Sequence, residues 1–337
     1  MPEKASLKKY NTFGIDACAN EIVTIKSVNQ LKEWYEKNPG KKFLILGEGS
    51  NVLFINDFDG TVLLNEIQGK KILREEDEKI LLQVKGGEKW HDLVMWAVDN
   101  DYGGIENLAL IPGKTGTAPI QNIGAYGTEI KDVISKVHAF DFKTGKLVEF
   151  HPAECRFGYR DSIFKKPENK NRYFITGIDL ELSRKNHRLN FSYGAIRDIL
   201  SKKGIKNPGI KDIAEAVIEI RKSKLPDPAK TGNAGSFFKN PIVDREKFEK
   251  IKKKYPDIPF YELDENHIKI PAGWLIEKAG FKGKKYGNAA VHDKQALVLV
   301  NLGNARGNEI KNLAEKIINK VKEKFDIILH PEVNFIE

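Results

Sequence analysis

The sequence has little cysteine, no long apolar run and few histidines, and each shortage excludes a class of protein. Two cysteines, Cys18 and Cys155, are too few for a disulfide framework or a cysteine-based metal site. No stretch approaches the roughly 18–20 apolar residues of a membrane span, and the N-terminal residues lack the apolar core of a secretory signal. The seven histidines form no metal-binding motif, so we expect no metal. A reducing cytoplasm is the expected compartment.

The chain is basic but its charge is dispersed. It has 337 residues, with 56 Lys and Arg against 47 Asp and Glu, giving a net charge of +9. The excess of Lys and Arg is explained first by solvated helix faces and second by a phosphate-bearing small-molecule ligand. Binding to nucleic acid is the third explanation, because no basic patch with interleaved aromatics is present. We expect no nucleic-acid partner. The length predicts two or three domains at about 150 residues each.

Hydrophobic spacing predicts a mixture of helices and strands. Helices are expected at 28–38, 90–97, 212–221 and 310–321, and strands at 43–46, 79–84 and 174–182. Pro226 and Pro228 follow the third helix, so a domain boundary is expected near residues 200–225.

The segment LILGEGSNVLF, residues 44–54, is the first candidate binding loop. Glycines let the backbone approach a ligand closely, and successive N–H groups can hold a phosphate. Val52 stands where a dinucleotide-binding fingerprint needs its third glycine, so a Rossmann site is not expected. A glycine-rich turn between two strands is an equally good interpretation.

The segment LIPGKTGTAPIQNIGAYG, residues 110–127, is the second candidate. Its GKT triplet resembles the end of a phosphate-binding loop, but Leu108 occupies the place of the required glycine and Pro119 prevents a long helix behind it. A nucleotide triphosphatase or kinase is therefore not expected. Lys114 either adds a phosphate contact or points to solvent. Long loops of this kind inside compact domains are usually functional.

Three further segments place polar residues among apolar neighbours. CRFGYRDSIFK contains Arg160, GNAGSFFKNP contains Ser236 and HPEVNFIE contains Glu332. Taken singly, they suit an ion pair, a turn residue and a solvated carboxylate. No GxSxG motif frames Ser236, so a serine hydrolase is not expected. The Phe pair after Ser236 is expected to exclude water from it.

Together these segments resemble the UDP-N-acetylenolpyruvoylglucosamine reductases, the flavoenzymes that make the muramic acid sugar of bacterial cell walls. NTFGI, KLPDP, AGWLIEKAGFKG and NAAVHDKQALVLVN also match, so the resemblance runs in the family's order from Asn11 to Ile336. FSYGAI, with Tyr193, resembles the tyrosine-bearing loop of the family's longer variant.

The resemblance implies an α+β fold. Residues 1–210 would form a two-lobed FAD-binding domain of the cresol-methylhydroxylase type, with the lobes dividing near residue 66. Residues 211–325 would form a smaller α+β substrate-binding domain. Residues 326–337 would return to the flavin site and bring Glu332 to it.

The resemblance also implies the site residues. Arg160, Ser236 and Glu332 would be catalytic. The expected FAD-binding residues are Gly47, Gly49, Ser50, Asn51, Pro112, Gly113, Gly116, Thr117, Gln121, Asn122, Gly124, Tyr126 and Gly127. The expected substrate-binding residues are Tyr193, Lys224, Asn240, Lys282 and Gln295.

The family's reaction, carried over, uses NADPH to reduce FAD, which then passes hydride to the enolpyruvyl ether of UDP-N-acetylglucosamine to give UDP-N-acetylmuramate. Arg160 and Glu332 would stabilise the enolate, and Ser236 would protonate it. FAD is expected to be non-covalent, because neither glycine loop contains a histidine. The enzyme is expected to be a monomer without a membrane partner. The alternative is another FAD-dependent oxidase or dehydrogenase on the same fold.

Overall fold

The computed structural model describes residues 4–337, and contacts among them define two compact units. Unit 1 comprises residues 19–48 and 59–223, and unit 2 comprises residues 4–18, 49–58 and 224–337. The boundary at residue 223 lies within the expected range 200–225. It differs from the predicted end of the FAD-binding domain at residue 210, and the functional domain assignment remains a prediction. Residues 1–3 of that predicted domain lie outside the described residues.

The helices of unit 1 are α1 (Val28–Lys37), α2 (Trp90–Asp99), α3 (Pro152–Cys155), α4 (Gly194–Lys202) and α5 (Ile210–Lys224). The strands that lie in it wholly or for most of their length are β2 (Cys18–Ile25), β3 (Phe43–Leu46), β5 (Phe58–Asn65), β6 (Lys70–Glu75), β7 (Lys79–Lys85), β8 (Gly124–Ala125), β9 (Thr128–Glu129), β10 (Ile134–Asp141), β11 (Lys146–Phe150) and β12 (Tyr173–Ser183). Strand β5 lies between β2 and β3, and it runs parallel to β3.

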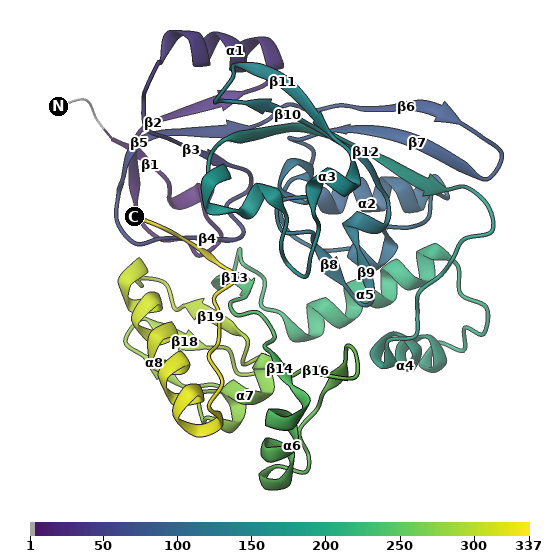
Figure 1. The fold of residues 1–337 in the computed structure, drawn as a ribbon, viewed down its shortest axis with the longest axis vertical. Coiled ribbons are helices and arrows are strands. Elements are labelled where there is room, and N and C mark those ends of the chain that lie inside the picture. The colour runs from purple at the N-terminus through teal and green to yellow at the C-terminus, as the bar shows by residue number, and fades with distance from the viewer. Residues whose placement is uncertain (1–3) are drawn as a thin grey trace. The chain divides into compact units, whose positions relative to one another are not determined.

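An antiparallel sheet with the strand order β11-β10-β12-β7-β6 carries the main core of unit 1 (Figure 1). Val137 lies opposite Ile178, which in turn lies opposite Val84, and all three side chains are fully buried. Their hydrophobic cluster also includes Trp90 of α2 and Val217 of α5. Because successive strand residues point to opposite faces, this apolar face is the one that the two helices cover.

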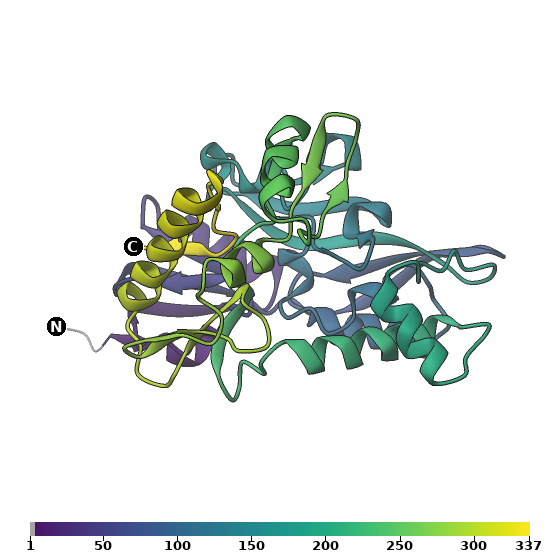
Figure 2. The same ribbon diagram turned by 90° about the horizontal axis from the view of Figure 1, so that it is seen from below.

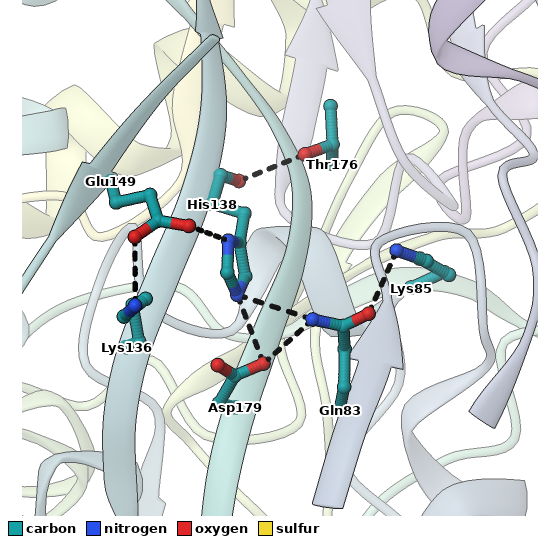
Figure 3. A network of polar contacts seen from close by, with 7 residues as sticks. All are labelled: Gln83, Lys85, Lys136, His138, Glu149, Thr176 and Asp179. Atoms are coloured by element: carbon teal, nitrogen blue, oxygen red, sulfur yellow. Dashed lines mark hydrogen bonds and ion pairs between the residues drawn. The ribbon is translucent and has the colours of Figure 1, made fainter. Parts of the chain in front are cut away.

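The opposite face of the sheet carries a polar network (Figure 3). Asp179 Oδ1 accepts a hydrogen bond from Gln83 Nε2 at 3.2 Å and lies 2.9 Å from His138 Nε2. The other ring nitrogen of His138 lies 3.1 Å from Glu149 Oε1, and Lys136 Nζ donates to Glu149 Oε2 at 2.7 Å. The network therefore links β7, β12, β10 and β11 in the order in which they pair.

The helices of unit 2 are α6 (Arg245–Lys254), α7 (Ala272–Lys278) and α8 (Gly307–Phe325). Its strands are β1 (Ala5–Ser6), β4 (Val52–Phe54), β13 (Gly232–Ser236), β14 (Ile242–Asp244), β15 (Tyr261–Glu262), β16 (His267–Lys269), β17 (Lys285–Tyr286), β18 (Ala289–Val291), β19 (Val298–Asn301) and β20 (Asn334–Ile336). The long yellow helix α8, drawn from two directions in Figure 1 and Figure 2, packs on β18 and β19 of the sheet β13-β19-β18-β17. A smaller sheet has the order β14-β16-β15.

The elements predicted from hydrophobic spacing are confirmed. Helices α1, α2, α5 and α8 and strands β3, β7 and β12 lie where the sequence placed them, and the chain is α+β. Spacing alone did not predict the parallel pairing of β20 with β4, which joins segments far apart in the sequence. Within residues 4–337, no helix is long and apolar enough to cross a membrane, and no cluster of His, Cys, Asp or Glu is arranged to hold a metal ion.

Candidate active site

The first glycine-rich segment, Gly47–Asn51, is shaped by the protein's own backbone and side chains. A Cβ atom on Gly47 would lie 2.7 Å from Thr117 Cγ2, and one on Gly49 would lie 2.0 Å from the carbonyl oxygen of Tyr10. Gly49 also has a φ of 66°, in the left-handed region that favours glycine. Close packing within the protein therefore requires these glycines, whether or not a ligand approaches them.

The two glycine-rich segments meet within unit 1. Glu48 Oε2 accepts a hydrogen bond from the Gly113 N–H at 2.7 Å. The Gly113 carbonyl oxygen accepts the N–H of Trp90, the first residue of α2, at 2.9 Å. Helix α2 and Glu48 thus hold the start of the second segment, and the predicted cofactor residues Gly47 and Gly113 lie in segments that contact each other.

The middle of the second segment forms a short 3₁₀ helix, Thr115–Thr117. The N–H groups of Thr115, Gly116 and Thr117 donate to protein carbonyl oxygens at 2.8, 2.8 and 2.9 Å respectively. These three donors are therefore engaged within the protein and do not form an open phosphate cradle.

Lys114 was left with two interpretations by the sequence, and the structure gives a third. Its side chain is only 6% exposed and forms an ion pair with Glu66. Its Nζ also donates to the carbonyl oxygen of Asn65 at 2.7 Å. The interpretation in which Lys114 points to solvent is therefore wrong. The phosphate contact is disfavoured as well, because a carboxylate already neutralises the charge.

Several residues around the second segment have strained backbones. Leu110, Asn122, Tyr126 and Arg160 have φ angles of 58°, 45°, 50° and 54°. Such left-handed conformations cost about 1–2 kcal/mol for residues with a Cβ atom, and they concentrate at binding and active sites. Asn122 is held by its own side chain, whose Nδ2 donates to Glu129 at 2.9 Å and to the Gly158 carbonyl at 3.1 Å. The cluster supports this segment as the functional centre of unit 1.

The predicted catalytic residue Arg160 is held against the second segment. Its Nη2 donates to the carbonyl oxygen of Gly124 at 2.5 Å. A Cβ atom on Gly124 would lie 3.1 Å from Arg160 Nη1, so a larger residue there would crowd the guanidinium. The hydroxyl of Ser162 donates to the Ile120 carbonyl at 2.6 Å and fixes the same turn. Unit 1 therefore brings Arg160 together with predicted FAD-binding residues.

Arg221 of α5 also contacts this segment, although the sequence pattern did not single it out. Its Nε donates to the Leu110 carbonyl oxygen at 3.2 Å, and its side chain hydrogen-bonds the Tyr126 hydroxyl. The Tyr126 ring meets the Tyr193 ring edge-on, with 5.2 Å between centroids. A predicted FAD-binding tyrosine and a predicted substrate-binding tyrosine are thus in contact. Only the position of Arg221, three residues before Lys224, could have suggested it.

Ser236 and Glu332 lie on adjacent segments of unit 2. Ser236 is the last residue of β13 and lies opposite Val298 of β19. The N–H of Glu332 donates to the carbonyl oxygen of Phe237 at 2.8 Å, one residue beyond Ser236. Phe237 and Phe238 are 0% and 1% exposed, whereas Ser236 is exposed. The expectation that this Phe pair shields Ser236 from water is therefore wrong, because both rings pack in the core.

The C-terminal segment also contacts the first glycine-rich segment where that segment lies in unit 2. Asn51 Nδ2 donates to the Glu332 carbonyl at 3.2 Å, and the Asn51 carbonyl accepts the Asn334 N–H at 3.0 Å. The pairing of β20 with β4 continues these contacts. Glu332 is thereby attached to the predicted FAD-binding residue Asn51.

Three predicted substrate-binding residues gather around α7. Asn240 Oδ1 accepts the N–H of the first helical residue at 2.9 Å. Gln295 Oε1 would lie 2.9 Å from a Cβ atom on Gly273, the second helical residue. Lys282 Nζ donates to Glu277 of the same helix at 2.9 Å. Lys224 is the last residue of α5 and is exposed.

The groups of unit 1 fit an anionic cofactor such as FAD. Among residues 4–337, no Asp or Glu side chain forms an ion pair with Arg221, so no protein carboxylate neutralises its charge. Arg160 adds a second cation beside the same segment. The Arg221 guanidinium can hydrogen-bond anionic or carbonyl oxygens, which FAD supplies through its diphosphate and ring.

The fold and these residues define an FAD-dependent oxidoreductase. Residues 19–151 match the model of an FAD binding domain. Residues 227–336 match the C-terminal domain of UDP-N-acetylenolpyruvoylglucosamine reductase.

Individual relatives define the family. A UDP-N-acetylenolpyruvoylglucosamine reductase of Flavobacterium johnsoniae is 50% identical over 331 residues, which is 98% of each chain. One from Bacteroides fragilis is 46% identical over the full length of both chains. The crystal structure of the enzyme from Thermus caldophilus has the same fold, with a TM-score of 0.68 at 24% identity over 99% of this chain and 98% of that chain. The chain belongs to the UDP-N-acetylenolpyruvoylglucosamine reductase family.

Proposed function

We propose that this protein reduces UDP-N-acetylglucosamine enolpyruvate to UDP-N-acetylmuramate, with NADPH as the hydride donor, in the synthesis of peptidoglycan precursors. The observation that carries the proposal is the 50% identity to a named reductase over 98% of both chains. FAD, when bound, supplies a group that accepts hydride from NADPH and delivers it to the terminal vinyl carbon. We further propose that the enzyme acts in the cytoplasm as a monomer, without nucleic-acid partners.

Arg160 is proposed to bind the substrate carboxylate. Hydride addition to the vinyl carbon leaves negative charge on the carbon next to this carboxylate, as an enolate. A guanidinium carries a permanent charge and donates two parallel hydrogen bonds to a carboxylate. The hydrogen bond to Gly124 and the left-handed backbone of Arg160 support a fixed position for the cation.

Ser236 is proposed to donate the proton that completes the reaction, to the carbon next to the carboxylate. A serine hydroxyl is a weak acid, but a carbanion-like carbon is a strong base and positioning lowers the barrier further. The exposed position of Ser236 at the end of β13 supports access by a substrate. Glu332 is proposed to stabilise the enolate, which requires it to hold or share a proton because a bare carboxylate would repel the charge.

The substrate diphosphate and uridine are proposed to bind Tyr193, Lys224, Asn240, Lys282 and Gln295. Support comes from the grouping of Asn240, Gln295 and Lys282 around α7. A lysine ammonium beside a diphosphate is a favourable pair of charges.

Two measurements test this function. Anaerobic addition of NADPH should bleach the flavin absorbance, and subsequent addition of the enolpyruvyl substrate should restore it. Restoration by oxygen, but not by the enolpyruvyl substrate, would favour the alternative of another FAD-dependent oxidase on this fold. Acid or heat should release all the yellow colour into solution, because FAD is proposed to be non-covalent; colour retained by the denatured protein would contradict that point.

A further inference from the structure

We propose that Arg221 is a positioning residue of this enzyme, which fixes the segment Leu110–Gly127 in the shape that binds FAD and holds Tyr126 against Tyr193. The inference rests on the proposed function, since it assigns that segment to FAD.

Arg221 joins the two ends of the segment. Its Nε donates to the carbonyl oxygen of Leu110, the first residue, at 3.2 Å. Its side chain also hydrogen-bonds the hydroxyl of Tyr126, the residue before the last. A planar guanidinium with five donors in a fixed fork serves two acceptors at once in a way that an ammonium does not. One side chain on the rigid helix α5 therefore links the entrance and the exit of the segment.

Both residues that Arg221 contacts have strained backbones. Leu110 and Tyr126 have φ angles of 58° and 50°, and such conformations persist only where the surroundings hold them. The N–H of Leu110 is held as well, since it donates to His91 Nδ1 at 3.0 Å. Burial lowers the pKa of His91, with Arg221 among the nearby cations, so the ring stays neutral and can accept this hydrogen bond. His91 and Arg221 thus hold the two peptide groups that flank the Leu110 Cα, one through its N–H and the other through its carbonyl oxygen.

The guanidinium of Arg221 has hydrogen-bond acceptors in the protein but no carboxylate partner among residues 4–337. Burial lowers its pKa, as does the neighbouring cation Arg160. Keeping a partly buried cation without an anion is unfavourable, so a purely structural link would be better served by a neutral donor. The charge is favourable once an anionic ligand binds to the segment.

Tyr126 connects Arg221 to Tyr193, a proposed substrate-binding residue. Its ring packs edge-on against Tyr193, which precedes the first residue of α4. Releasing the Tyr126 hydroxyl from Arg221 frees this ring and removes the surface on which Tyr193 rests. Loss of Arg221 should therefore weaken FAD binding first and substrate binding second.

The test compares Arg221→Met and Arg221→Lys with Lys211→Met, an exposed cation of the same helix. FAD affinity of the apoprotein is measured by flavin fluorescence, and apoprotein stability by thermal unfolding. Arg221→Met should weaken FAD binding about tenfold or more, as expected for a charged hydrogen-bonding group. Arg221→Lys should recover only part of the loss, and Lys211→Met should match the wild type. In a double-mutant cycle, Tyr126→Phe should add little to Arg221→Met, since the two side chains act as one link.

Three outcomes would overturn the proposal. These are FAD affinity within twofold of the wild type in Arg221→Met, full recovery by Arg221→Lys, or independent additive losses in the cycle. A lower unfolding temperature with unchanged FAD affinity would show a merely structural role. If Arg221→Met does not fold, Arg221→Lys and Tyr126→Phe, which keep the bulk of each side chain, decide the same question. A wild-type enzyme that binds FAD but does not reduce the enolpyruvyl substrate would overturn the proposed function alone.

Discussion

The Glu48 carboxylate accepts the backbone N–H of Gly113 at 2.7 Å and so ties the first glycine-rich segment to the second. Glu48→Ala leaves this N–H without its acceptor, which should lower the stability of the apoprotein by about 1–3 kcal/mol. Glu48→Gln keeps an acceptor oxygen and should recover most of the loss. Thermal unfolding of the three apoproteins measures this. Equal stability of Glu48→Ala and the wild type would show that the contact contributes nothing.

Because Lys114 forms an ion pair with Glu66, replacing Lys114 should lower the stability of the apoprotein rather than its affinity for FAD. The Lys114 side chain is 6% exposed, and removing one partner of a buried pair costs about 3–5 kcal/mol, with the lower end expected because Glu66 is 35% exposed. Lys114→Met should therefore unfold at a clearly lower temperature, while the exposed control Lys41→Met should not. Unchanged apoprotein stability combined with weak FAD binding would instead support a phosphate contact.

The polar network of His138 and Asp179 on the main sheet of unit 1 predicts that the stability of the fold depends on pH in the acid range (Figure 3). Burial alone would raise the pKa of Asp179, but hydrogen bonds from His138 and Gln83 and the charge of His138 outweigh it and lower the pKa. A carboxyl group whose pKa is lower in the folded state stabilises the fold above its unfolded pKa of about 3.9. This contribution is lost as the pH falls through the folded pKa.

Asp179→Asn should therefore be less stable than the wild type at neutral pH, and the difference should shrink as the pH falls below about 4. Chemical denaturation at a series of pH values measures the difference, and Asp198→Asn on the exposed side of α4 is the matched control. A difference that persists unchanged to about pH 3 would mean that packing, and not ionisation, is responsible.

The sequence predicted the elements of this fold well and their contacts poorly. Val28, Leu31 and Trp34 have helical spacing, and α1 forms there, because the apolar face of a helix is set by residues close in sequence. The pairing of β20 with β4 and the contact of Glu48 with Gly113 join residues far apart in the chain, so no local period reports them. Lys114 illustrates the same limit, since its partner Glu66 is brought to it only by folding.

Some residues of the candidate site were predicted from the sequence, and others were found only in the structure. Arg160, Ser236 and Glu332 were selected by resemblance, and the structure shows Glu332 beside the segment of Ser236 within unit 2 and Arg160 beside Gly124 within unit 1. Arg221 belongs to no motif that the sequence analysis identified. Its role can be inferred only from its contacts with Leu110 and Tyr126, which folding brings to it.

Tyr193 and Lys224 are predicted to act on the substrate and not on NADPH. Tyr193→Phe and Lys224→Ala should weaken substrate binding, by roughly ten- to a hundredfold for the lysine, because a charge-assisted contact is worth about 1.5–3 kcal/mol. Reduction of the flavin by NADPH should stay near the wild-type rate. The steady-state KM for the enolpyruvyl substrate measures the first effect, and stopped-flow flavin reduction measures the second. Replacement of the exposed Lys222 by alanine, Lys222→Ala, is the control. Unchanged substrate affinity in Lys224→Ala would remove that residue from the site.

Ser236 is proposed to protonate the enolate, and stopped-flow spectroscopy of Ser236→Ala tests this role. Flavin bleaching by NADPH should proceed as in the wild type, since that half-reaction needs no proton from serine. Reoxidation by the enolpyruvyl substrate should slow by about 10²–10⁴-fold or more, the usual contribution of general acid catalysis. Ser236→Cys should recover part of this loss, and the exposed control Ser201→Ala should change neither step. Equal slowing of both half-reactions in Ser236→Ala, or of neither, would contradict the assignment.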